Sequence, residues 1–251
     1  MLAMRSGWLL VLVGACGHAR ESPPPVPETC TAATIETAPL AECERRCAAG
    51  SPAACATTAG KYCRGYGGIA PDVKQCLSFA LRACERASAQ GCWYAAEVYS
   101  GAGDSTTRSV DDEMRALRRM LELHERDCAA GHGPACIETA TWYDQPNPKA
   151  DWPLRDPERA ARDLARGLEL EQKSCDGGDG YACALLALEI GGNPKVTKDR
   201  ARQFALTRRA CELGHAPSCS DAALLPDANR DELMKRACTL GLASACMPAT
   251  P

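Results

Sequence analysis

Apolar side chains recur at fixed distances before a series of cysteines, on what would be one face of a helix. Val73, Leu117 and Leu164 stand eleven residues before such a cysteine, and Leu77, Leu121, Leu168 and Phe204 stand seven before it. Residues four, seven and eleven apart lie on the same side of an α-helix. The pattern predicts a short helix before Cys47 and five longer ones, at 72–87, 111–129, 157–176, 198–213 and 229–240.

Each of these helices ends at a cysteine that is followed by a second cysteine eight residues later. The phrase CAAGHGPAC at 128–136 is one example, and the same spacing occurs six times. Successive first cysteines are 37, 44, 47, 36 and 27 residues apart. A period of about 20–50 residues is typical of stacked helical or strand units. The chain is therefore predicted to form a repeat solenoid, in which each unit packs only on its neighbours.

The beginning of the chain resembles an export signal. Arg5 precedes an apolar run at 8–13 that is too short to cross a bilayer. The run leads to Val13-Gly14-Ala15-Cys16, which resembles a bacterial lipobox. We predict a signal peptide at 1–16 with Cys16 as the lipidated residue.

A proline-rich tether at 17–36 is expected to follow the lipidated cysteine. The alternative is an ordinary signal peptide cut near Ala15 or Ala19. If Cys16 is lipidated, the mature protein should be exported and attached to the membrane by lipid alone. The expected location is the periplasmic face of the outer membrane or the cell surface.

Setting Cys16 aside leaves sixteen of the 17 cysteines, an even number. An even number of cysteines in an exported protein, which meets oxidising conditions, favours disulfide bonds. Residues eight apart in one helix are about 12 Å apart, whereas a disulfide needs α-carbons within about 7 Å. A turn is therefore required, and Gly50, Ser51 and Pro52 suit a C-cap, an N-cap and a helix start. Each pair is predicted to staple the elbow of an αα-hairpin: Cys47–Cys55, Cys84–Cys92, Cys128–Cys136, Cys175–Cys183, Cys211–Cys219 and Cys238–Cys246.

Four further cysteines are harder to pair. Cys76 and Cys84 are also eight apart, but LSFALRA between them predicts unbroken helix. Cys30–Cys43 and Cys63–Cys76 are each 13 apart and are the expected extra bridges, although four cysteines allow three pairings. The competing interpretation is a zinc array, which the absence of C-x-x-C and H-E-x-x-H in the sequence disfavours. No metal and no cofactor are expected.

Small residues and a period of about 36–44 residues resemble the Sel-like repeat family, relatives of tetratricopeptide repeats. The cysteine pair in nearly every unit is similar to the Helicobacter cysteine-rich protein family. The resemblance covers roughly 37–250, with a short fifth unit and a last unit truncated after Met247. It implies an all-α fold at 37–251, a right-handed αα-hairpin solenoid of about five to six units used mainly for protein–protein interaction. Some relatives are catalogued as penicillin-binding proteins or β-lactamases.

The sequence contains little that indicates catalysis. No serine has a lysine three residues later, and there are only four histidines. His132 and His215 occupy the same elbow position and are interpreted as turn residues. A net charge of −3 gives no reason to expect nucleic acid. A hydrolase or binder acting on β-lactams or peptidoglycan fragments therefore remains the alternative, through family resemblance only.

His124 and Glu171 form the one site hypothesis. Both stand four residues before an elbow cysteine in successive units, so they are expected to face each other across neighbouring repeats. The alternative is two residues at the edge of the apolar stripe whose polar ends reach solvent. We predict a scaffold of the bacterial cell envelope that binds a protein partner. The groove is expected to be lined by the first helix of each hairpin, with the second helices outside.

Overall fold

A computed structural model describes residues 29–31, 34–144 and 154–246 of the 251-residue chain. Within this part the secondary structure is entirely helical. The α-helices are α1 (Leu40–Ala48), α2 (Pro52–Arg64), α3 (Val73–Glu85), α4 (Ala89–Tyr99), α5 (Val110–Ala129), α6 (Gly133–Asp144), α7 (Pro157–Asp176), α8 (Gly180–Gly192), α9 (Arg200–Glu212), α10 (Ala216–Ala222) and α11 (Arg230–Thr239). Short 3₁₀ turns are η2 (Tyr66–Gly68), η3 (Ser105–Thr107) and η4 (Ala243–Cys246). The predicted signal peptide and Cys16 lie outside the described residues.

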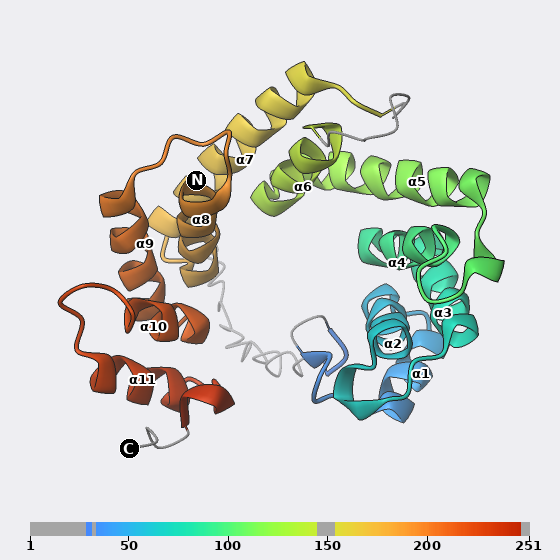
Figure 1. The fold of residues 1–251 in the computed structure, drawn as a ribbon, viewed down its shortest axis with the longest axis horizontal. Helices are drawn as coiled ribbons and strands as arrows, with labels where there is room; N and C mark the ends of the chain where they lie inside the picture. The colour runs from blue at the N-terminus through green and yellow to red at the C-terminus, as the bar shows by residue number, and fades with distance from the viewer. Residues whose placement is uncertain (1–28, 32–33, 145–153, 247–251) are drawn as a thin grey trace, which may run out of the picture.

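The helices form successive antiparallel hairpins that stack side by side along a curved path (Figure 1). The predicted helix at 157–176 coincides with α7, and the other four differ from α3, α5, α9 and α11 by at most two residues at either end. The all-α repeat solenoid is therefore confirmed. None of the described helices is both long and apolar enough to cross a bilayer.

Disulfides join the two helices of every hairpin. The six elbow pairs expected from the spacing of eight are bonded, and their α-carbons lie 4.5–4.7 Å apart. Cys30–Cys43 and Cys63–Cys76 are bonded as well. The extra two bridges both lie in the first two hairpins, so that region has twice as many bridges per unit as the rest.

The elbows share one backbone design. The residue three positions after the first cysteine has a positive φ, and it is glycine in most units, as at Gly131 (φ +95°) and Gly214 (φ +91°). Left-handed backbone carries little steric cost for glycine but is unfavourable for residues with a Cβ. The second hairpin departs from this rule, because Ala87 occupies the position with φ +65°.

The two layers of the solenoid are arranged opposite to the prediction. Figure 1 shows the second helices α2, α4, α6, α8 and α10 on the inner, concave side, and the first helices on the outside. The expectation that the first helices line the groove is therefore wrong. Side-chain size supplies the reason: sequences such as ACATTAG in α2 and ACALLALEIGG in α8 are rich in small residues. Small side chains let helices approach closely on the inner radius of a curve, whereas long arginine and glutamate side chains fit the wider spacing outside.

Arginines also connect one outer helix to the next. Arg209 of α9 donates from Nη2 to the carbonyl of Cys175 at 3.1 Å, and Arg236 of α11 donates to that of Glu212 at 3.0 Å. Both carbonyls belong to the last turn of the preceding outer helix, where intrahelical donors are missing. Some of the arginines of the outer helices therefore cap helix ends between units.

Candidate functional site

His124 and Glu171 line one cavity, as the sequence hypothesis requires. The cavity has a volume of about 500 Å³ and includes elbow residues of two successive hairpins, among them Asp127, Glu138 and Asp179. Glu171 comes from α7 and is only 4% exposed, while His124 comes from α5 and is half-buried. The structure therefore brings the two side chains into a shared cavity beside the elbows of two successive hairpins.

Burial decides the electrostatics of this cavity. It raises the pKa of the Glu171 carboxyl above its ordinary value, and the negative charge of Asp179 raises it further. Burial also lowers the pKa of His124, against the opposing charges of Glu138 and Asp127. Both shifts favour the uncharged forms, so the pair is not held together as an ion pair.

Glu171 is buried because it packs on the elbow of the preceding hairpin. A Cβ added to Gly133 would overlap its Oε1 atom. Gly167 of α7 is equally close to α6, since a Cβ there would lie 2.7 Å from Ile137 Cγ1. These two glycines permit the close approach of α6 and α7. The position of Glu171 is thus explained by packing between units.

The elbow histidines have structural surroundings. His215 is the N-cap residue of α10, and its Nδ1 lies 2.8 Å from Ser218 Oγ. The Tyr181 ring meets the His215 ring edge-on at 5.9 Å. No group of three or more metal-ligating side chains occurs within the described ranges.

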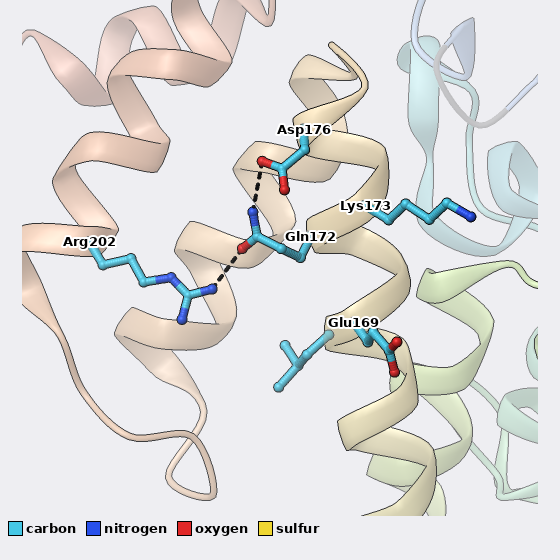
Figure 2. A pocket seen from close by; sticks show the side chains of 6 residues that line it. Glu169, Gln172, Lys173, Asp176 and Arg202 are labelled. Carbon is cyan, nitrogen blue, oxygen red and sulfur yellow. Dashed lines mark hydrogen bonds between the residues drawn. The ribbon is translucent and has the colours of Figure 1, made fainter.

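A second depression lies on the outer surface between α7 and α9, where Figure 2 shows its side chains. Arg202 donates to Gln172 Oε1 at 2.7 Å, and Gln172 donates from Nε2 to Asp176 Oδ1 at 3.0 Å. Lys173 points away from this chain of hydrogen bonds. Because three of its polar groups already satisfy one another, the depression is better explained as a contact between units.

The exposed surface of the inner helices follows a register that the sequence reasoning missed. In α6, α8 and α10 the positions two before, two after and five after the second cysteine are exposed or half-buried, while most others are buried. These positions lie on one side of each helix, and the helices that carry them form the concave side of the stack (Figure 1). We call them the concave stripe: Pro134, Glu138 and Thr141 of α6, Tyr181, Leu185 and Leu188 of α8, Pro217 and Asp221 of α10, and Leu224 just after the end of α10.

The concave stripe contains some of the most exposed apolar side chains of the described chain. Leu224 is 74% exposed, Leu188 is 64% exposed and Tyr181 is 56% exposed. Leu188 also borders a mostly apolar cavity of about 900 Å³ between α6, α7 and α8. An available signal was the repetition of leucine five residues after the cysteine in both units. The mostly apolar run YACALLALEIGG concealed it, because such a run is typical of a buried helix.

Comparison with known proteins finds similar folds. No protein-family model matches the chain, and no curated protein matches it in sequence. A protective antigen of uropathogenic Escherichia coli with an SLR fold is 17% identical, with a TM-score of 0.39; the match covers 82% of this chain and 42% of the antigen. A Sel1 repeat protein from Oxalobacter formigenes is 17% identical over 84% of this chain and 77% of its own, with a TM-score of 0.43.

The immunity protein Pa5087 of Pseudomonas aeruginosa is also similar, at 13% identity and a TM-score of 0.46. That match covers 82% of this chain and 73% of the immunity protein. The first two are Sel1-type repeat proteins, the family that the repeat period and the small residues of this chain resemble. The chain spans about two-fifths of the length of the antigen.

Proposed function

We propose that this protein is an interaction scaffold whose concave stripe binds a segment of another protein. The observation that carries the proposal is the exposure of Leu188 and Leu224 in the same register of neighbouring inner helices. Exposed apolar side chains that gather on one concave face are typical of interaction surfaces. Stacked repeats extend such a face over several units, which suits an elongated partner.

The test is capture of partners from a cell-envelope extract by the oxidised protein. Leu188→Asp and Leu224→Asp together place two charges in the centre of the stripe and should abolish capture of any specific partner. Val110→Asp is the matched control, because Val110 is 57% exposed on the outer helix α5. Capture that survives the double change but is lost with Val110→Asp would place the interface on the outer surface and contradict the proposal.

The cellular setting is part of the same proposal. An exported protein would meet the oxidising conditions in which eight disulfides persist. Lipidation at Cys16 would then hold the solenoid at a membrane surface. Changing Cys16 to Ser should release the protein into the soluble envelope fraction, and a wild-type protein without lipid would contradict the anchor.

A further inference from the structure

The charges of the inner layer have one sign over most of its length. Helices α4, α6, α8 and α10 contain no lysine or arginine. They contain five acidic residues: Glu97, Glu138, Asp144, Glu189 and Asp221. The outer helices α5, α7 and α9, in contrast, carry several arginines each. These four inner helices are therefore acidic wherever they are charged, whereas the first inner helix, α2, contains Lys61 and Arg64.

Two of these carboxylates are available to a partner. The other three have neighbours: Glu97 pairs with Arg64, Asp144 lies 3.2 Å from Lys195 Nζ, and Glu189 accepts a 2.7 Å hydrogen bond from Asn193 Nδ2. Glu138 and Asp221 are exposed, and neither has a hydrogen-bond or ion-pair partner among the residues that the structure describes. Both belong to the concave stripe.

The two carboxylates flank an apolar centre. Glu138 lies on α6 and Asp221 on α10, both two residues after the cysteine, and α8 between them presents Leu185 at that position. Leu188 extends the apolar surface along α8. A ligand crossing the three helices would thus meet an acidic group, then leucines, then a second acidic group.

The chain itself shows how a segment sits on this register. In the first two units, Ile35 and the Tyr94 ring of α4 both lie against Gly60 of α2. A Cβ on Gly60 would be 2.6 Å from Ile35 Cδ1 and 2.6 Å from Tyr94 Oη. Gly60 is five residues after its cysteine and Tyr94 is two after its own. The equivalent positions on α8 and α10 are Leu188 and Asp221, where the described chain contributes no such cover.

We propose that the concave stripe binds a basic segment of its partner, with an apolar side chain seated between α8 and α10. Lysine or arginine side chains of that segment pair with Glu138 and Asp221. Acidic segments and nucleic acid are disfavoured, since their charge has the same sign as that of the inner layer. This inference rests on the proposed function and specifies the chemistry of the partner.

A library of random short peptides displayed on phage tests the chemistry directly. Selection on the oxidised protein should enrich peptides that contain lysine or arginine together with leucine or isoleucine. An enriched peptide, made synthetically, should bind about tenfold more weakly when Glu138→Gln and Asp221→Asn are combined. Its affinity should also fall as salt rises. Glu158→Gln is the matched control, because that side chain is 92% exposed on the outer helix α7.

The outcomes separate this inference from the proposed function. Enrichment of acidic or uncharged peptides, or no enrichment, overturns the basic chemistry. The scaffold proposal then still stands if Leu188→Asp with Leu224→Asp abolishes capture from the extract. Basic peptides that bind the Glu138→Gln, Asp221→Asn protein as well as the wild type overturn the assigned contacts. Equal loss with Glu158→Gln would show general charge attraction and would overturn them too.

Discussion

The stripe register differs in exposure between the first two hairpins and the last three inner helices. In α2 and α4 the stripe positions Thr57, Gly60 and Tyr94 are buried, and Ile35 from the N-terminal segment lies against Gly60. In α8 and just after α10, the positions equivalent to Gly60 carry the exposed Leu188 and Leu224. The first region also holds four of the eight disulfides. One end of the solenoid is thus closed and heavily cross-linked, and the other presents its inner face.

The largest expected effect comes from removing one disulfide from the first two hairpins or from the hairpin of α9 and α10. A bridge that closes a loop of about this size contributes about 2–3 kcal/mol in the chain-entropy treatment. Cys211→Ala with Cys219→Ala removes the only bridge of its hairpin, whereas Cys63→Ala with Cys76→Ala leaves the Cys47–Cys55 and Cys84–Cys92 elbows bonded. We expect early proteolytic cleavage near α9 and α10 in the first variant.

Thermal unfolding by circular dichroism, together with mapping of the cleavage sites, measures both variants. The second variant should show a lower melting temperature without a new early cleavage site. Cleavage in α3 and α4 that is as early as in α9 and α10 would contradict the greater cross-linking of the first region.

Gly60 and Leu188 occupy the same register and should respond differently to alanine. At Gly60 a Cβ would press on Ile35 and Tyr94, so Gly60→Ala should destabilise by about 1–3 kcal/mol through overpacking. At the exposed Leu188, alanine should change the free energy of unfolding by no more than about 0.5 kcal/mol. Denaturant titration measures both. Equal changes in the free energy of unfolding would show that Gly60 and Leu188 are covered to the same extent.

The elbows offer a smaller comparison within the first region. Ala87 has φ +65° where other hairpins have glycine, so Ala87→Gly should stabilise the protein by about 0.5–1 kcal/mol. The reverse change, Gly131→Ala, should destabilise by a similar amount, since a Cβ there meets open space and only the backbone is strained. A loss of stability in Ala87→Gly, measured by thermal unfolding, would contradict this explanation.

The smallest expected effect depends on pH. The position four residues before the elbow cysteine is Ala80 in the first region and Glu171 in the second. Burial raises the folded-state pKa of Glu171, so its favourable contribution is complete below the ordinary value of 4.5 and is lost as pH rises through the folded-state pKa. Glu171→Gln should therefore gain stability relative to wild type as the pH rises from below 4.5. A stability difference that does not change with pH would contradict the burial of the charge.

Local signals in the sequence determined the hairpins. Cysteines eight apart could bond only across a turn, and Gly50, Ser51 and Pro52 supplied one, so the elbows and the boundaries of α7 followed from short-range chemistry. The apolar stripe through Leu117 and Leu121 identified the outer helices for the same reason, because both residues lie on one face of α5. Backbone preference and helix periodicity act over a few residues, and they can be read from one segment at a time.

Only the tertiary structure decided which layer faces inward and which part of it stays open. The curvature of the stack depends on how closely α6 can approach α7 through Gly133 and Gly167, and no single hairpin contains that information. The same holds for the stripe: Gly60 and Leu188 occupy the same position of the register, but Ile35 lies against Gly60, whereas Leu188 is 64% exposed. Burial on the concave face results from contacts between segments far apart in the chain, which is why the sequence alone placed the groove on the wrong helices.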